Sequence, residues 1–171
     1  MRRKDRELSQ EEALMIIKNT KMAVLSMISN DKRPYATPIS PVFIDGKIFF
    51  HSSSSPDGLR KTSLLKDNHV VVTYVGYNEN DLAYLPGLSV NYVSAIVSGR
   101  ASLVTDEQKK KALTIKLAEI QFPMAEKKGI EETYAGSHEY IDLWEIEITS
   151  VTGKGRNKHL YFKLEANESK A

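Results

Sequence analysis

The chain has 171 residues, 41% hydrophobic and 27% charged, which is ordinary for a globular domain and long enough to bury a core. A formal net charge of +2 gives no support for nucleic acid or a membrane surface as a partner, and the absence of cysteine excludes disulfides and cysteine-ligated zinc. No apolar run approaches the roughly 18 residues of a membrane span and no signal peptide is visible, so we expect one cytoplasmic domain over 1–171.

The first twenty residues are expected to contain a short helix. Ser9 and Glu12 have the spacing of a capping box, in which each residue's side chain bonds the backbone N–H of the other. The helix is predicted to end near Asn19. Its buried face is predicted to comprise Ala13, Leu14, Ile16 and Ile17. The apolar run Met22–Ser29 then predicts a buried strand, followed by a turn.

The next strand, predicted over Tyr35–Ile44, contains two prolines. Each proline removes a backbone donor, so the strand should be irregular or lie at a sheet edge. Asp45-Gly46 then separates two runs of strand character, which is a strong hairpin signal because a type I′ turn needs positive φ at both central residues. The second strand of this hairpin is predicted over Lys47–Ser52.

A loop of small residues, 53–58, leads to the middle of the chain. Leu59–Asp67 fits a short helix with Leu64 and Leu65 facing inward. The β-branched run Val70–Tyr77 predicts a strand, and the segment 78–88 is predicted as a loop because it carries Pro-Gly.

The second half begins with a long predicted strand, Val90–Thr105, with a bulge or bend at Gly99. Thr105 is predicted to cap a helix that runs to about Gln121, and Met124–His138 is expected to be partly helical.

Apolar residues and glutamates alternate over 144–148, which predicts a half-buried strand with Trp144 in the core. Residues 151–156 are predicted as a basic turn and 165–171 as a flexible tail. About six strands in sequence, with tight turns and peripheral helices, favour an antiparallel barrel over a βαβ nucleotide-binding fold.

One segment has the composition of a phosphate site. A strand ends in His51-Ser52-Ser53, and a loop then opens a helix that bears Arg60 and Lys61. Hydroxyls, free N–H groups at a helix start and two cations are the groups that bind phosphate. The same residue types also fit a solvent-exposed loop with two surface bases, and they contain no dinucleotide fingerprint.

Two further features have alternative explanations. The stretch Thr37–Ser40 lies in the proline-interrupted strand, so its unpaired backbone groups suit the polar edge of a flat heterocycle, or else protect a sheet edge. His51 could donate a proton, bind a metal, stack on a ring or be structural. No metal site is assigned, because the other histidines lack companions at ligand spacing.

The ordered motifs resemble a known family. Arg33-Pro-Tyr-Ala-Thr-Pro-Ile-Ser40, Asp45-Gly-Lys-Ile-Phe-Phe-His-Ser52 and Ser94-Ala-Ile-Val-Ser-Gly-Arg-Ala101 carry the likeness, which extends over roughly residues 1–156. The chain resembles the pyridoxamine 5′-phosphate oxidase-like FMN-binding split-barrel superfamily, and within it the branch associated with nitroimidazole resistance.

The resemblance implies a mainly β fold, an antiparallel six-stranded split barrel with flanking helices, that forms a homodimer with FMN at the interface. It also implies that His51 is the catalytic residue beside the flavin ring. The implied cofactor-binding residues are Thr37, Pro38, Ile39 and Ser40 along the ring, and His51, Ser52, Ser53, Arg60 and Lys61 toward the phosphate. The loop before Arg60 is about two residues longer than the usual pattern, which leaves the phosphate contact open between Arg60 and Lys61.

Three functions are considered on this basis. The first is an FMN-dependent oxidoreductase that passes electrons from NAD(P)H to a small, electron-poor aromatic such as a nitroimidazole. The second is a flavin- or haem-binding module without turnover. The third is a pyridoxamine 5′-phosphate oxidase-like enzyme, for which a second phosphate would have only the basic segment 154–158.

Overall fold

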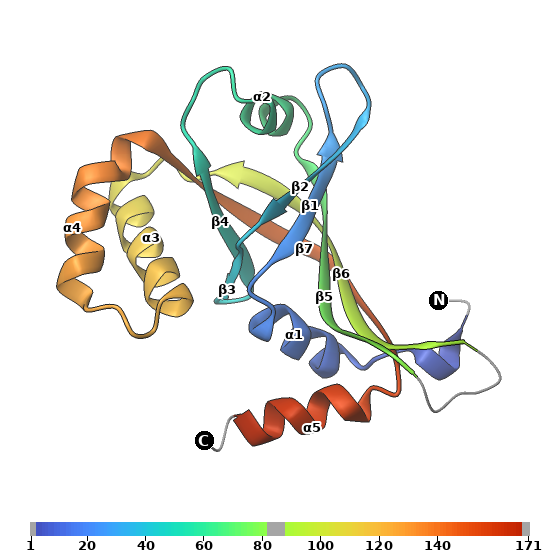
Figure 1. Cartoon of the computed structure of the whole chain (residues 1–171). Coiled ribbons are helices and arrows are strands. Elements are labelled where there is room, and N and C mark those ends of the chain that lie inside the picture. Colours follow the sequence, from blue (N-terminus) through green and yellow to red (C-terminus); the bar gives the residue numbers. More distant parts are fainter. Residues whose placement is uncertain (1–2, 82–87, 169–171) are drawn as a thin grey trace.

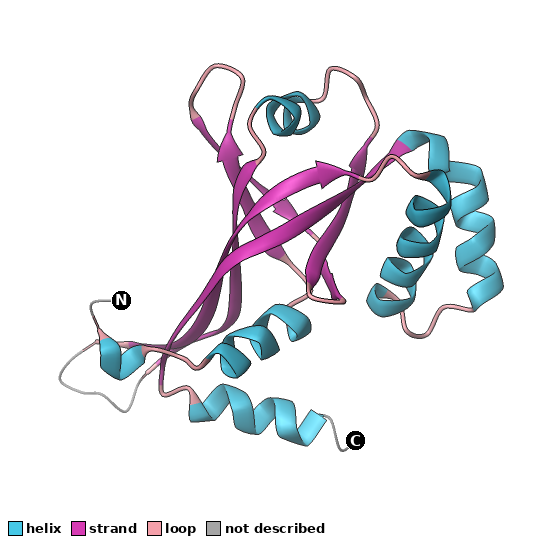
Figure 2. Cartoon of the chain, turned by 180° about the vertical axis from the view of Figure 1, so that it is seen from behind, coloured by secondary structure: helices cyan, strands magenta, loops and turns pink. Residues whose placement is uncertain are grey.

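An antiparallel sheet forms the centre of the molecule, and helices surround it (Figures 1 and 2). The computed structural model describes residues 3–81 and 88–168, the side chains of 164–168 excepted. The strands are β1 (Ala23–Ile28), β2 (Pro34–Ile39), β3 (Val42–Ile44), β4 (Lys47–Ser53), β5 (His69–Asn80), β6 (Val90–Leu103) and β7 (Ile141–Arg156). The α-helices are α1 (Gln10–Asn19), α2 (Leu59–Lys66), α3 (Glu107–Gln121), α4 (Lys127–Ser137) and α5 (His159–Glu168).

The sheet curls into a barrel because its two edge strands are neighbours in the chain. The strand order is β2-β1-β5-β6-β7-β4-β3, which places β2 and β3 at opposite edges. Only Ser40 and Pro41 separate these two strands, so the edges must approach each other without forming a ladder in the described residues. The predicted antiparallel split barrel with flanking helices is confirmed. In the described residues the sheet has seven strands rather than six, because the predicted strand Tyr35–Ile44 is divided at Ser40-Pro41 into β2 and β3.

Several local predictions are confirmed. The capping box of α1 is complete, with 2.8 Å from Ser9 N to Glu12 Oε2 and 3.1 Å from Glu12 N to Ser9 Oγ. Asp45 and Gly46 have φ of 49° and 82° in the hairpin between β3 and β4. The register of β6 with β7 shifts at Gly99, where an added Cβ would lie 2.6 Å from the Glu147 carbonyl oxygen.

The helices cover different parts of the barrel (Figure 1). α1 and α5 lie together below one end of it, α2 lies across the other end, and α3 and α4 form a pair at one side, as both cartoon views show. The barrel interior holds fully buried side chains such as Leu25, Phe50, Val72 and Trp144. No helix in the described part of the chain is long and apolar enough to cross a bilayer.

The predicted basic turn over 151–156 is wrong, because β7 continues through it to Arg156. The glycines in this segment serve packing rather than turning. A Cβ added at Gly153 would lie 2.8 Å from Leu8 Cβ, so only glycine lets this segment approach so closely. The tail prediction is wrong for residues 165–168, which belong to α5; residues 169–171 lie outside the described residues.

Other boundaries and orientations also differ from the predictions. Asp106, not Thr105, caps α3, since its side chain accepts a hydrogen bond from Lys109 N at 2.7 Å. Leu65 is 63% exposed and faces away from the core, whereas Leu64 is buried. β5 runs on to Asn80, and residues 82–87 of the predicted loop lie outside the described residues.

The strand over 144–148 is more buried than predicted, because Glu145 is buried as well as the apolar residues beside it. Glu145 is buried on the outer face of β7, where it forms ion pairs with Lys47 of β4 and Lys109 of α3. These pairs favour the charged carboxylate and lower its pKa despite the opposing effect of burial, which is the largest single influence on it. The cluster therefore helps to attach α3 to the barrel.

Candidate functional site

Arg60 lies at the end of the barrel that α2 covers. It is in the first turn of α2, and its Nη2 donates a hydrogen bond to Thr37 Oγ1 of β2 at 3.0 Å. Its Nε is buried and has no hydrogen-bond partner among the described residues. A buried guanidinium with an unused donor is costly unless an acceptor reaches it, and phosphate oxygens are acceptors of the right geometry.

Lys61 points to a different partner. Its Nζ lies 2.9 Å from Asp142 Oδ2 of β7 and donates to the Ser54 carbonyl oxygen at 3.1 Å. The pair is largely buried, since only 19% of the Lys61 side chain and 11% of the Asp142 side chain are exposed. The charge of Lys61 is thus already compensated within the chain, whereas Arg60 forms no ion pair among the described residues.

His51 lies on the outer face of β4 and its side chain is exposed. The surrounding protein nevertheless withdraws the imidazole from part of its water, and this desolvation lowers its pKa below the usual 6.5. The positive charge of Arg60 lowers the pKa further. His51 is therefore a neutral imidazole at neutral pH, close enough to Arg60 to sense its charge.

The two serines after His51 face opposite sides of β4. Ser52 is buried, and its hydroxyl accepts a hydrogen bond from Trp144 Nε1 at 3.1 Å inside the barrel. Ser53 is exposed, and its hydroxyl accepts from Ser55 N at 3.2 Å. Strand alternation therefore places only the Ser53 side chain on the face that carries His51.

The stretch from Thr37 to Ser40 also alternates. Thr37 and Ile39 point into the barrel, while Pro38 and Ser40 are exposed at the sheet edge. The Ser40 carbonyl accepts a hydrogen bond from Gln121 Nε2 at 2.6 Å, so the end of α3 is fixed to this stretch.

The structure thus brings some predicted residues together and separates others. A hydrogen bond joins Thr37 and Arg60, and the charge of Arg60 acts on His51 and lowers its pKa. Lys61 joins Asp142, which was not predicted, and the Ser52 hydroxyl belongs to the barrel interior. Asp142 has a recognisable signal in the sequence, because it is in phase with Trp144 on the inward face of β7. A carboxylate at such a position needs a partner.

The chemistry that this group favours is the binding of an anion beside a flat polar molecule. Arg60 offers a guanidinium with an unused donor, and the exposed edge at Pro38 and Ser40 lies in the strand that carries Thr37. No group of three or more His, Asp or Glu in the described residues is placed to hold a metal ion.

The coupling between Arg60 and His51 leads to a prediction. In Arg60→Met the pKa of His51 should rise, because the nearby positive charge is gone, but it should stay below 6.5 because desolvation remains. A proton NMR titration of the imidazole measures this. Lys66→Met, which removes a cation further along α2, serves as the control and should leave the His51 titration unchanged. An unchanged pKa in Arg60→Met would show that the two groups are not coupled.

Comparison with known proteins connects the chain to one family. The sequence profile of the pyridoxamine 5′-phosphate oxidase family matches residues 9–155. Among curated proteins there is no match.

Several solved structures share the fold. A protein of Bacteroides thetaiotaomicron provisionally assigned to 5-nitroimidazole antibiotic resistance has 15% identity and a TM-score of 0.70, over 87% of this chain and 86% of that one. An FAD-binding protein of Mesorhizobium loti has 16% identity and a TM-score of 0.60, over 89% and 98%. An FAD- and haem-binding protein of Mycobacterium smegmatis has 17% identity and a TM-score of 0.64, over 87% and 72%. At these identities the likeness concerns the fold alone.

Proposed function

The chain belongs to the pyridoxamine 5′-phosphate oxidase family, and from this premise we propose that it is an FMN-dependent oxidoreductase that reduces a small, electron-poor aromatic such as a nitroimidazole. Flavin binding is typical of the family. The observation that carries the proposal is the buried, unpartnered Nε of Arg60 beside Thr37 and His51.

The residues present fit the phosphate of FMN. Arg60 would bind it, because its unused donor can take a phosphate oxygen while Nη2 stays on Thr37. Ser53 and the backbone N–H groups at the start of α2 would add further donors. Lys61 contributes less in this arrangement, since Asp142 already holds it.

The ring of the flavin would lie toward the Thr37–Ser40 stretch, whose exposed edge offers backbone groups to a heterocycle. When bound, FMN supplies the redox chemistry, accepting electrons from NAD(P)H and passing them to the aromatic acceptor. We assign His51 to positioning the substrate or donating a proton to it. Because its pKa is lowered, the neutral imidazole would act as a hydrogen-bonding group at neutral pH.

A second candidate is a flavin- or haem-binding module without turnover. It is favoured by the shared fold of the FAD-binding and the FAD- and haem-binding proteins named above. The oxidase of pyridoxamine 5′-phosphate is less well supported. Its second phosphate would need the basic residues of 154–158, but Lys158 forms an ion pair with Glu12 at 2.7 Å and Lys154 lies over the Tyr92 ring.

The test of function begins with the spectrum of the purified protein. A flavin spectrum, reduction by NADH or NADPH without oxygen, and reoxidation by a nitroimidazole faster than free FMN would support the oxidoreductase. Flavin binding without reoxidation above the free-FMN rate would favour the binding module. A Soret band would indicate haem, and a colourless protein that does not take up FMN would refute the cofactor assignment.

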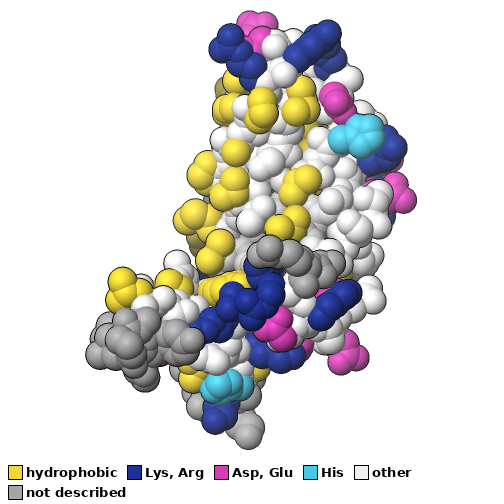
Figure 3. All heavy atoms as spheres, turned by 90° about the vertical axis from the view of Figure 1, so that its right-hand side faces the viewer, with side chains coloured by type: hydrophobic (Ala, Val, Ile, Leu, Met, Phe, Trp, Pro, Cys, Tyr) yellow, Lys and Arg dark blue, Asp and Glu magenta, His cyan; other side chains and the backbone are white. Residues whose placement is uncertain are grey.

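The homodimer is also a proposal, and the outer face of the sheet supports it. Val24, Val71, Val75 and Ile96 are each between 37% and 56% exposed on β1, β5 and β6. Strand register places them on one face with Pro38, Thr73, Ser94, Ser98 and Thr152. Figure 3 shows apolar side chains gathered along this side of the barrel. A broad surface of small, uncharged side chains is typical of an interface between copies.

This face also borders the candidate site, because Pro38 lies opposite Val24 in the register of β2 and β1. A second copy seated on the sheet would therefore cover the edge to which we assign the flavin ring. This supports a cofactor position at the interface between two copies.

We predict that Ile96→Asp converts the dimer to a monomer. Dimerisation would bury one unpaired carboxylate from each copy, so the dimer dissociation constant should rise by roughly a hundredfold. Light scattering during size-exclusion chromatography measures the mass of the particle. FMN retention should fall as the dimer is lost. Ile120→Asp is the control, because Ile120 is 47% exposed on α3, away from this face. A dimer that survives Ile96→Asp would exclude the sheet face as the interface.

A further inference from the structure

The helical pair α3–α4 is inserted between β6 and β7, two strands that a short turn could connect. β6 and β7 are antiparallel neighbours, and Leu103 at the end of β6 pairs with Trp144 near the start of β7. A turn of two residues can join such strands. The chain instead uses residues 104–140 for two helices at the side of the barrel, with α3 against β3 and β4 and α4 mainly against α3 (Figure 1).

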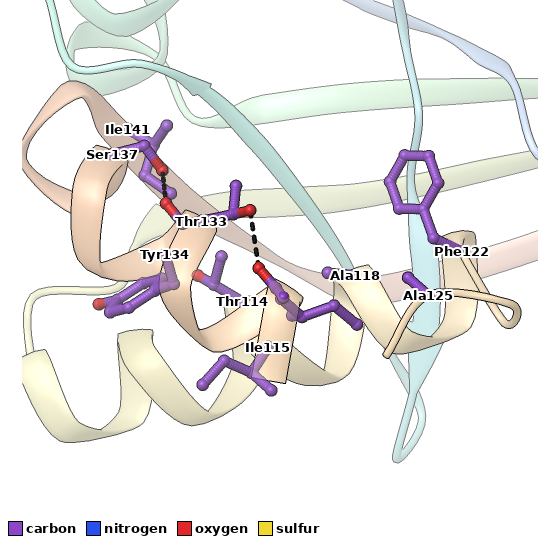
Figure 4. Close-up of a pocket in the computed structure, with 11 residues that line it drawn as sticks. Thr114, Ile115, Ala118, Phe122, Ala125, Thr133, Tyr134, Ser137 and Ile141 are labelled. Atoms are coloured by element: carbon purple, nitrogen blue, oxygen red, sulfur yellow. Dashed lines mark hydrogen bonds between the residues drawn. The ribbon is translucent and has the colours of Figure 1, made fainter. Parts of the chain in front are cut away.

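A pocket of about 310 Å³ lies between the two helices (Figure 4). Ile115 and Ala118 of α3, with Phe122 directly after that helix, form one wall. Ile130 and Tyr134 of α4 form the other, and Ile141 at the start of β7 also lines the pocket. The volume is at the lower end of the range for small-molecule sites, about 300–1,000 Å³.

Small residues keep this pocket open. Ala118, Ala125 and Gly129 line it, and a Cβ added at Gly129 would have no atom within 4 Å. Larger apolar side chains at these positions would fill the space between the helices, as the interior of a tightly packed pair requires. The helices therefore enclose a space that the chain itself does not occupy.

The walls carry no charged side chain and one unsatisfied polar group. The hydroxyls of Thr133 and Ser137 donate to carbonyls of their own helix, at 2.8 and 2.7 Å, as Figure 4 shows. Thr114 lines the same pocket, and its hydroxyl oxygen is buried and has no hydrogen-bond partner among the described residues. Burial raises the pKa of Tyr134, in keeping with a wall that is poorly hydrated.

We propose that the pocket between α3 and α4 binds a small, neutral, largely apolar molecule with one polar group that bonds the Thr114 hydroxyl. The uncharged walls exclude ionic ligands, because a buried charge would have no counter-charge there. The unpaired hydroxyl gives the ligand its orientation. This site is separate from the candidate flavin site, since the two share no lining residue.

Binding of 1-naphthylamine, a neutral aromatic amine at pH 7, to the full-length protein tests the proposal by equilibrium dialysis. One saturable site per chain is expected, with at least tenfold weaker binding of the anion 1-naphthalenesulfonate. Ala118→Phe should weaken 1-naphthylamine at least tenfold by filling the pocket, whereas Ala112→Phe, at an exposed position of the same helix, should not. Equal binding by the two variants, or equal binding of amine and sulfonate, would overturn the proposal.

Hydrogen exchange on the unmodified protein locates the probe without depending on the folding of a variant. Protection by 1-naphthylamine should appear in α3 and α4. Protection confined to β1, β5 and β6 would mean that the probe binds the apolar outer face of the sheet, and it would overturn the assignment. Thr114→Val should weaken 1-naphthylamine several-fold and leave naphthalene unchanged, and an equal effect on both would remove Thr114 from the site. FMN binding enters none of these measurements, so their outcome is independent of the proposed function.

Discussion

Replacing Arg60 with methionine is expected to weaken FMN binding by about ten- to a hundredfold, the effect of losing one or more charge-assisted hydrogen bonds worth roughly 1.5–3 kcal/mol each. Methionine keeps much of the apolar length of the side chain, so the change removes the guanidinium with little loss of packing. Titration of the flavin-free protein with FMN, followed by flavin fluorescence or calorimetry, measures the affinity.

Two variants on the same helix make this measurement specific. Lys66→Met removes an exposed cation at the end of α2 and should leave FMN affinity unchanged. Lys61→Met should reduce FMN affinity less than Arg60→Met and reduce stability more, because it leaves Asp142 largely buried without its cation. If Lys61→Met weakened FMN more than Arg60→Met, the phosphate would belong to Lys61.

The sequence alone leaves the choice between Arg60 and Lys61 open, because adjacent residues of a helix have the same local environment until the rest of the fold is known. The partners that separate them come from β2 and β7, far along the chain: Thr37 for Arg60 and Asp142 for Lys61. The preference for Arg60 therefore depends on tertiary contacts that no local pattern contains.

Features with a local physical cause could be predicted from the sequence. The capping box at Ser9, the hairpin at Asp45-Gly46 and the bulge at Gly99 each follow from backbone requirements of a few neighbouring residues. The proline-interrupted strand was expected at an edge, and both β2 and β3 lie at edges. These signals, in order along the chain, were enough to predict the barrel class.

Features set by distant packing were missed. Gly153 looks like a turn residue in sequence, but it is a strand residue beside Leu8 and Ala13, which approach from the other end of the chain. The C-terminal helix was missed for a related reason, since Tyr161 is buried in the main core only through tertiary contacts. The different environments of Ser52 and Ser53 were also missed: Ser52 bonds Trp144 inside the barrel, and Ser53 bonds the Ser55 backbone at the surface.

Trp144→Ala should have the largest effect on stability, lowering the free energy of unfolding by about 3–5 kcal/mol. Trp144 is fully buried, stacks on Phe50 with ring centroids 6.4 Å apart, and donates its indole N–H to Ser52. The alanine variant would leave a cavity at the barrel centre and remove the hydrogen bond that the Ser52 hydroxyl accepts. Because Trp144 is the only tryptophan, unfolding must be followed by circular dichroism in urea rather than by intrinsic tryptophan fluorescence.

Trp144→Phe and Ser52→Ala separate packing from the hydrogen bond. Each should cost about 1–2 kcal/mol, and the double variant should cost less than their sum, because both changes remove the same bond. Strictly additive costs would mean that this bond contributes nothing to stability. Ser52→Ala should also leave FMN affinity nearly unchanged, since the hydroxyl faces Trp144 inside the barrel. A tenfold loss of FMN affinity would instead place that hydroxyl on the phosphate, and the barrel end below α2 would have to rearrange when the cofactor binds.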